Sequence, residues 1–138
     1  MKLIKNKMTR PDTIPILIER VWGWFSKYIR LRDAKNGYCN CISCGRTYHW
    51  KEMHAGHFVP KARGNAIYFN EKDCNAQCIH CNYYKHGNVS EYRVKIDEKW
   101  GKGTADEMER LAKPNKKFTI EELKEMLAHY KKEVNKLK

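Results

Sequence analysis

The sequence predicts an α+β protein in which a cysteine-rich central part is flanked by helices on both sides. Apolar residues recur at three- and four-residue steps before residue 37 and again after residue 90, as in helices with one buried face. Between these parts the helical period disappears, and cysteines, histidines, glycines and short apolar stretches replace it. A chain of 138 residues fits a single compact domain, which we divide into 1–37, 38–89 and 90–138.

The first part is predicted to hold a basic arm and one long helix. Residues 1–10 contain four basic side chains and no acidic one, which favours a flexible arm. The stretch 12-DT-13 ahead of Pro15 is typical of a helix start, because the first turn has no use for the N–H that proline lacks. Asn36-Gly37 is expected to end the helix, since glycine adopts the left-handed cap conformation at little cost. The apolar residues at helical steps are Ile14, Ile18, Val21, Trp22, Phe25, Tyr28 and Ile29.

The central part is predicted to contain two short strands and a short helix. We interpret 57-HFV-59 and 66-AIYF-69 as strands joined by the basic loop 60-PKARGN-65. The helix is expected to begin near the second cysteine pair and to stop by Gly87.

The last part is predicted to be helical. One helix is expected from Ser90 to Gly101, with apolar residues at Tyr92, Ile96 and Trp100. Thr104 with Glu107 forms a capping box that opens a short helix, which Pro114 stops.

A second capping box, Thr119 with Glu122, opens the final helix. Its apolar residues form a narrow seam: Ile120, Leu123, Leu127, Tyr130, Val134 and Leu137. The seam is expected either to pack against the N-terminal helix of the same chain or to join two chains in a homodimer. Two heptads fall short of the three or four that indicate a coiled coil.

The charge of the chain predicts a polyanionic partner. Lys+Arg 28 and Asp+Glu 16 give a net charge of +12, and such an excess opposes compaction unless an anionic partner compensates it. DNA is the first candidate and an anionic membrane the second. The apolar run 16-ILI-18 is too short for a signal peptide or a spanning helix, so we expect no membrane association and a cytoplasmic location.

The cysteines predict a structural zinc site. Four of them form two pairs with two residues between the partners: Cys41, Cys44, Cys78 and Cys81. Two such turns can surround one ion with four thiolates, which leaves no open coordination position for catalysis. Without a secretory signal, this spacing favours metal over disulfides. Cys39 could replace Cys41 in a shifted site, but the two-residue spacing favours Cys41. Cys74 is expected to be a small buried apolar residue.

Polar residues that suit catalysis cluster between and after the cysteine pairs: His54, His57, Asp73, Asn75 and Asn82. The order is cysteine pair, His-x-x-Pro, basic glycine-containing loop, short strand, and second cysteine pair followed by asparagine. This order resembles the HNH nucleases that carry paired zinc cysteines. The resemblance implies a zinc-stapled ββα-metal core, also called a His-Me finger, between the flanking helices.

The motifs look most like those of the phage NinG/Rap recombination nucleases. The matching stretches are 41-CISCGR-46, 55-AGHF-58, 68-YFNE-71, 77-QCIHCN-82, and 87-GN-88 with 92-YR-93. They cover roughly residues 38–93 and, more faintly, the C-terminal helix. A phage resolvase of the endonuclease VII type is a more distant likeness. The resemblance implies DNA cleavage in branched or Holliday-junction recombination intermediates and a twofold dimer that cuts both strands.

By this resemblance His57 is the general base and Asn82 holds a catalytic ion, Mg²⁺ or Mn²⁺, near His57. A histidine with an ordinary pKa near 6.5 can take a proton from water at neutral pH. A hard cation prefers the amide oxygen of Asn82 to the thiolates of the zinc site. Lys61, Arg63 and Lys85 are expected to contact phosphates of the DNA.

Two positions depart from the common HNH pattern. Gly56 stands where many members have an Asp or His metal ligand, so that ligand would be His54, Glu71 or water. Asp73 stands where HNH proteins usually have the asparagine of the His-Asn-His triplet that gives the family its name. Asn75 is a nearby substitute. Either residue could orient the imidazole of His57, and Asp73 would also raise its pKa.

Two other functions remain open from the sequence. One is an HNH nicking endonuclease that acts on ordinary duplex DNA, and the other is a non-catalytic zinc module that binds DNA through charge. The tryptophans are assigned to the core and not to base stacking: Trp22, Trp24, Trp50 and Trp100.

Overall fold

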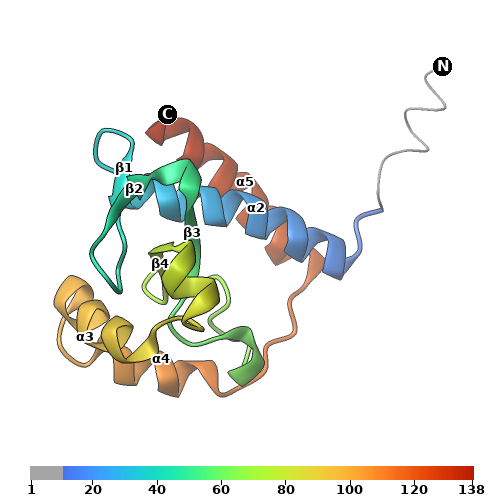
Figure 1. Ribbon diagram of the computed structural model, residues 1–138. Coiled ribbons are helices and arrows are strands. Elements are labelled where there is room, and N and C mark those ends of the chain that lie inside the picture. The colour runs from blue at the N-terminus through green and yellow to red at the C-terminus, as the bar shows by residue number, and fades with distance from the viewer. Residues whose placement is uncertain (1–10) are drawn as a thin grey trace.

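The structure is a computed structural model that describes residues 11–138 (Figure 1). The basic arm expected at residues 1–10 lies outside the described residues. The elements are α2 (Ile14–Asp33), β1 (Tyr38–Asn40), β2 (Thr47–His49), η1 (Trp50–Glu52), β3 (Met53–His57), η2 (Lys61–Arg63), β4 (Cys74–Cys78), η3 (His80–Tyr84), α3 (Val89–Trp100), α4 (Thr104–Ala112) and α5 (Ile120–Leu137). The predicted mixture of helices at both ends with short strands between them is confirmed.

The long helix α2 begins as predicted but ends earlier. The Thr13 hydroxyl caps it by accepting a hydrogen bond from the Ile16 N–H at 3.4 Å. The helix stops at Asp33, so the prediction that Asn36-Gly37 caps it is wrong. Asn36 and Gly37 do adopt left-handed conformations, at φ 55° and 85°, but they form the turn that leads into β1.

Helices α2 and α5 pack against each other along one edge of the molecule (Figure 1). They run in the same direction, because Asp12 pairs with Lys124 near their starts and Phe25 packs on Tyr130 further along, with ring centroids 5.0 Å apart. The buried residues of α5 are Leu123, Tyr130 and Val134. The seam therefore packs within the chain, and it does not supply the dimer contact that we considered for it.

Two antiparallel hairpins lie beside α2. The first joins β1 to β2, and its loop carries the first cysteine pair. The second joins β3 to β4, pairing Met53 with Cys78 and His57 with Cys74. The predicted strands 57–59 and 66–69 are therefore wrong.

Backbone hydrogen bonds place residues 66–69 in turns and not in a strand, from the Tyr68 N–H to the Asn65 carbonyl at 3.1 Å and from the Asn70 N–H to the Ile67 carbonyl at 2.9 Å. The Asn70 side chain accepts from the N–H groups of Lys72 and Asp73, at 2.8 and 3.1 Å, and so holds a turn. Ile67 and Phe69 are both buried and stand two positions apart, a spacing that mimics one face of a strand, but they belong to different core clusters. Strand β4 is buried at every position and shows no alternation in its sequence.

The predicted short helix after the second cysteine pair is present as a π-helix, η3. The Lys85 N–H bonds the His80 carbonyl at 3.0 Å, a step of five residues. The Gly87 N–H then bonds the Cys81 carbonyl at 2.8 Å and closes the segment as expected. Isolated π-turns are rare and often lie at functional sites.

The helices of the last part follow the prediction with one correction. Helix α3 ends before Gly101, and Thr119 with Glu122 forms both bonds of a capping box. Thr104 lies inside α4, and its hydroxyl donates to the Gly101 carbonyl at 2.7 Å. The capping box predicted for Thr104 is therefore wrong. Within residues 11–138, no helix combines the length and the apolar composition that crossing a bilayer requires.

Gly56 has a packing reason to be glycine. A Cβ atom at this position would collide with the Gln77 side chain across the hairpin. The Gln77 amide cannot move freely, because it donates to the Ser43 hydroxyl at 2.9 Å and to the Gly87 carbonyl at 2.6 Å. The Asp or His that many HNH proteins have here would not fit.

We predict that Gly56→Ala lowers the free energy of unfolding by about 1–3 kcal/mol, because the added methyl group overpacks the hairpin. Gly23→Ala is the control, since a Cβ on Gly23 would meet nothing within 4 Å. It should leave stability unchanged or raise it by up to about 1 kcal/mol through helix propensity. Urea denaturation measures both, and equal stability of the two variants would contradict the packing argument.

Candidate metal centre and catalytic site

The four paired cysteines converge on one point. The sulfur atoms lie within 4.8 Å of one another and come from Cys41, Cys44, Cys78 and Cys81. A tetrahedral zinc ion with Zn–S bonds of about 2.3 Å would hold its sulfurs about 3.8 Å apart. The sulfurs of Cys44 and Cys78 are 3.7 Å apart, which fits zinc.

Backbone and side-chain donors surround these sulfurs. The Cys44 N–H points to the Cys41 sulfur at 3.5 Å, and the Cys81 N–H points to the Cys78 sulfur at 3.4 Å. The Asn88 amide donates to the Cys81 sulfur at 3.4 Å. Such donors stabilise thiolates, as expected for ligands of a cation.

The two remaining cysteines lie outside the four-sulfur cluster, so Cys41 and not Cys39 joins it, and Cys74 is buried as predicted. Cys39 and Cys74 are fully buried. Burial raises the pKa of Cys39 to about 11 and that of Cys74 well above its usual range, so both stay thiols. Cys74 also lies close to His57 and Asp73, with potential ligand atoms within 4.8 Å of one another. Cys74 and Asp73 do not line the open hollow described below.

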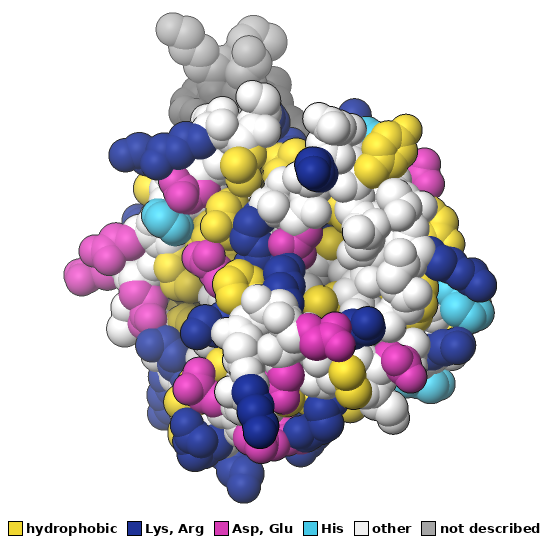
Figure 2. Space-filling view, turned by 90° about the vertical axis from the view of Figure 1, so that its left-hand side faces the viewer, with side chains coloured by type: hydrophobic (Ala, Val, Ile, Leu, Met, Phe, Trp, Pro, Cys, Tyr) yellow, Lys and Arg dark blue, Asp and Glu magenta, His cyan; other side chains and the backbone are white. Residues whose placement is uncertain are grey.

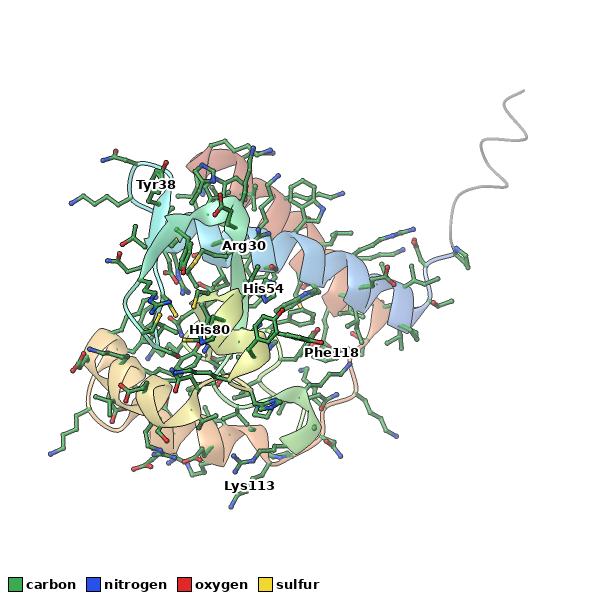
Figure 3. The ribbon with its side chains drawn as sticks, viewed as in Figure 1. Arg30, Tyr38, His54, His80, Lys113 and Phe118 are labelled. Carbon is green, nitrogen blue, oxygen red and sulfur yellow. The ribbon has the colours of Figure 1, made fainter. Side chains whose placement is uncertain are left out.

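Asn82 follows Cys81 within η3 and contacts His54 of β3. Its Nδ2 donates to His54 Nδ1 at 2.9 Å, which leaves the amide oxygen available for another partner. Burial, and then the charge of Arg30, lower the pKa of His54, so that its ring stays neutral and can accept this bond. Figure 3 shows His54 between Arg30 on α2 and η3, the segment that contains His80.

His57 ends β3 and is held on three sides. Its Nε2 bonds the Tyr68 carbonyl at 2.9 Å, and its ring packs against those of Trp22 and Tyr68, with centroids 5.0 and 4.9 Å away, in a cluster of three mutually contacting rings. A carbonyl only accepts, so the neutral ring carries its proton on Nε2 and keeps the lone pair on Nδ1. Burial lowers the pKa of His57, the Tyr68 carbonyl raises it and the charge of Lys61 lowers it, with a net decrease.

His57 and Asn82 line one open hollow, with a volume of about 420 Å³. The structure thus brings together the two residues to which the resemblance gives the central roles. Lys61 and His86 also line the hollow, so a basic group and a second imidazole face the same space.

Asp73 does not orient His57. Its Oδ1 accepts from the Val59 N–H at 3.0 Å, and its Oδ2 is buried without a partner within the described residues. Burial raises the pKa of Asp73 to about 7. The expectation that the charge of Asp73 raises the pKa of His57 is wrong, because burial of both groups dominates and the pKa of His57 is lowered.

Two further candidates are engaged elsewhere, Asn75 for orienting His57 and Glu71 for the missing metal ligand. The Asn75 oxygen accepts from Lys99 at 2.7 Å and from the Trp100 indole at 3.0 Å. The Glu71 carboxylate accepts from the hydroxyls of Tyr28 and Tyr130, at 3.1 and 3.0 Å, and so ties the hairpin to α2 and α5. Within the described residues, the Tyr68 carbonyl and not Asp73 or Asn75 fixes the orientation of His57.

The three basic residues assigned to DNA differ in their surroundings. Lys61 lines the hollow and lies over the Tyr68 ring at 5.1 Å. Lys85 is exposed just after η3. Arg63 faces α4, where its guanidinium lies 3.9 Å from Glu109.

Two contacts of His57 were missed from the sequence. Trp22 was assigned to the core by its helical spacing, and nothing in that spacing shows that its ring covers a histidine 35 positions later. The Tyr68 carbonyl is a backbone group, which the identity of residue 68 cannot reveal. Both contacts depend on the turn at 66–70 that replaced the expected strand.

We predict that Cys44→Ala abolishes zinc binding and lowers the melting temperature by about 10 °C or more. Cys44 is exposed, so its truncation creates no cavity and the loss reports the metal. Cys39→Ala is the control, which should keep one zinc per chain. Metal content by mass spectrometry and thermal unfolding measure the two effects. A wild-type zinc content in Cys44→Ala would show that this cysteine is not a ligand.

We predict that Asp73 makes the protein less stable as pH rises. Because its folded pKa is about 7 and an unfolded aspartate has about 3.9, the stability gained from its proton is complete below pH 4 and is lost through pH 7. Between pH 4 and pH 7 the loss approaches about 1.4 kcal/mol per pH unit, and above pH 7 it levels off, because both states are then deprotonated. Asp73→Asn should flatten this decline in urea titrations between about pH 4 and about pH 7. Parallel profiles of the two proteins would contradict a buried neutral carboxyl.

Comparison with known proteins places the chain among phage proteins. Protein ninG of Escherichia phage lambda is 36% identical over 111 residues, which make up 80% of this chain and 52% of that relative. Protein ninG of Salmonella phage P22 is 35% identical over 111 residues, which again make up 80% of this chain and 52% of that relative. The chain thus spans about half the length of these relatives. No solved structure matches the chain.

The family model described as Bacteriophage Lambda NinG protein matches residues 16–138. This range includes both cysteine pairs, the two hairpins and every residue that lines the hollow. The family model and the relatives agree, and the chain belongs to the NinG family.

Proposed function

We propose that the chain is a metal-dependent DNA endonuclease that hydrolyses phosphodiester bonds, with branched or Holliday-junction DNA as its favoured substrate. The observation that carries this proposal is the hollow lined by both His57 and Asn82. A base and an oxygen ligand that face one open space are the minimum that metal-assisted hydrolysis requires.

In this proposal His57 Nδ1 takes a proton from a water molecule. The water oxygen forms a bond to phosphorus, the bond from phosphorus to the leaving sugar oxygen breaks, and that oxygen takes a proton from solvent. The lowered pKa of His57 keeps the base unprotonated at neutral pH. The hydrogen bond to Tyr68 and the stacked Trp22 ring hold the imidazole in place without occupying Nδ1.

Asn82 would hold the catalytic Mg²⁺ or Mn²⁺ through its amide oxygen. When bound, that ion polarises the scissile phosphate and neutralises charge on the leaving oxygen. The donors in the hollow fit such an ion, since Mg²⁺ keeps several waters and needs few protein ligands. Because its Nδ2 donates to His54, the Asn82 side chain presents oxygen and not nitrogen to the hollow.

The zinc cluster supports this role by fixing the position of Asn82. Cys81 and Asn82 are adjacent in η3, and the Asn88 amide on the Cys81 sulfur ties the end of the segment to the same cluster. A ligand residue whose position is fixed by surrounding contacts holds its metal ion in a defined geometry.

The choice of a branched substrate rests on the likeness of the motif order to phage recombination nucleases. The names of the NinG relatives state no activity, so family membership does not decide the substrate. Cutting a junction symmetrically requires two active sites, and a homodimer is part of the proposal. Since the α5 seam packs on α2, the dimer must use another surface.

We predict that His57→Ala reduces Mg²⁺-dependent cleavage of a four-way junction by about 10²–10⁴-fold, the usual contribution of a general base, and leaves DNA binding intact. His80→Ala is the matched control, because His80 is exposed in the same zinc-anchored segment. Cleavage rates with and without added Mg²⁺ provide the readout. A His57→Ala protein that cuts at the wild-type rate would remove His57 from the mechanism.

A side-by-side digestion of junction and linear duplex separates the remaining functions. Faster cutting of the junction supports the proposal, and equal cutting indicates a nicking endonuclease for ordinary duplex. Binding without cleavage of either DNA by the zinc-loaded wild type indicates a non-catalytic module.

A further inference from the structure

A second basic surface lies on α2, η1 and α5. Two tryptophans form its centre, Trp24 of α2 and Trp50 of η1. Four cations lie over their rings, Lys27, Arg30, Lys51 and Lys131, and Lys138 lies beside Lys27. Lys27 lies between the two rings, 5.6 Å from the centre of Trp24 and 5.9 Å from that of Trp50. We call these seven residues the Trp24–Trp50 surface.

The cations of this surface repel one another without compensation. Within residues 11–138, no ion pair joins any of the five to a carboxylate side chain. The Lys138 ammonium, burial, and the charges of Arg30 and Lys51 all lower the pKa of Lys27. Like charges held this close destabilise the free protein, and an anionic partner removes that cost.

On another face of the molecule, positive and negative side chains are mixed. Figure 2 views the face that carries the first hairpin and α3, where Lys and Arg side chains are interspersed with Asp and Glu. On this face Lys95 pairs with Glu98 at 3.4 Å, and Lys99 pairs with Asp33 at 2.8 Å. The Trp24–Trp50 surface differs from this face in that its cations have no carboxylate side chain as a partner within residues 11–138.

The surface borders a groove between α2 and α5 with a volume of about 390 Å³. The lining residues are Glu19, Arg20, Gly23, Trp24, Lys27, Leu127 and Lys131. Gly23 leaves open space in the middle of the longest helix, where alanine would be favoured by up to about 1 kcal/mol. The groove combines lysine ammonium groups with the face of an indole, the pair of groups that binds phosphates and stacks on bases.

Arg30 connects this surface to the candidate catalytic site. Its guanidinium lies 5.4 Å from the centre of the Trp50 ring, and its charge lowers the pKa of His54. His54 in turn bonds Asn82, which lines the hollow. Figure 3 shows Arg30 and His54 next to each other along this path.

We infer that the Trp24–Trp50 surface binds the sugar–phosphate backbone of a DNA segment that continues from the candidate catalytic hollow. The lysines contact phosphates, and the indoles pack against sugars or unpaired bases. The inference rests on DNA as the substrate of the proposed function, but it does not depend on the cleavage step. It adds a binding surface on a different side of α2 from Trp22, the residue that stacks on His57.

The test replaces three exposed or partly exposed lysines at once, Lys27→Gln, Lys51→Gln and Lys131→Gln, in a His57→Ala background that cannot cut. Affinity for a fluorescent four-way junction is measured at several salt concentrations without added Mg²⁺. The slope of log affinity against log salt should decrease by about 2.7, which is 0.9 for each of three lost phosphate contacts. Binding is the readout, so the test is informative even if the wild-type protein proves not to cleave DNA.

The matched control removes the same charge elsewhere, with Lys102→Gln, Lys113→Gln and Lys117→Gln. These lysines are exposed, and Figure 3 shows Lys113 at the opposite end of the molecule from Arg30. The control should change the salt slope by less than about 1. Equal losses in both triple variants would mean that only total charge matters and would overturn the inference, as would an unchanged slope in the first variant.

A single substitution tests the groove with little risk to folding. Gly23→Glu places a carboxylate in open space on the helix, and Gly23→Gln adds a side chain of the same size without charge. Both should unfold at or above the wild-type temperature, because each replaces a helical glycine. Gly23→Glu should bind the junction about fivefold or more weakly than Gly23→Gln, since a like charge repels phosphate. Equal affinities of these two variants would exclude DNA from the groove.

An anionic membrane is the other polyanion that such a surface could meet. Cosedimentation with phosphatidylserine vesicles separates the two partners. We expect the triple variant of Lys27, Lys51 and Lys131 to lose affinity for the junction. If the triple lost vesicle binding and kept the salt slope of DNA binding, the surface would belong to a lipid partner and the inference would be wrong.

Discussion

The convergence of four sulfurs is the constraint on which the rest of the structure depends. Cys41 and Cys44 come from the loop of the first hairpin, Cys78 ends β4, and Cys81 lies in η3. One ion among them would join elements whose own strands are only three to five residues long. The Ile42 N–H, bonded to the Ala76 carbonyl at 2.9 Å, shows that the first loop already docks on β4. The position of Asn82 follows from this clamp, because it is the next residue after Cys81.

Burial then sets the chemistry of the groups near the hairpin. The rings of Trp22 and Tyr68 cover His57 and lower its pKa, so that it is neutral and has a free Nδ1. Burial also raises the pKa of Asp73 to about 7, so this carboxyl keeps its proton at lower pH. A charged Asp73 beside His57 would orient the ring more strongly, but its negative charge would also raise the pKa of His57 and favour a protonated imidazole. The backbone carbonyl of Tyr68 orients the ring without adding charge.

The sequence predicted the parts that local rules control. Periodic apolar residues identified α2, α3 and α5, and the two-residue cysteine spacing identified the four sulfurs that meet in space. The central strands were misplaced because β4 is buried at every position, while Ile67 and Phe69 alternate although they lie in a turn. The stacking of Trp22 on His57 and the pairing of Asn82 with His54 depend on tertiary packing, for which the sequence carries no local signal.

We propose above all that zinc positions Asn82 so that a second cation can bind beside His57. Crystals of the zinc-loaded protein soaked in Mn²⁺ would test it, with anomalous difference maps recorded at the zinc and manganese absorption edges. We expect a zinc peak among the four sulfurs and a separate manganese peak within coordination distance of the Asn82 amide oxygen. A zinc peak without manganese in the hollow would leave a zinc-stabilised DNA-binding protein and contradict the proposed catalysis.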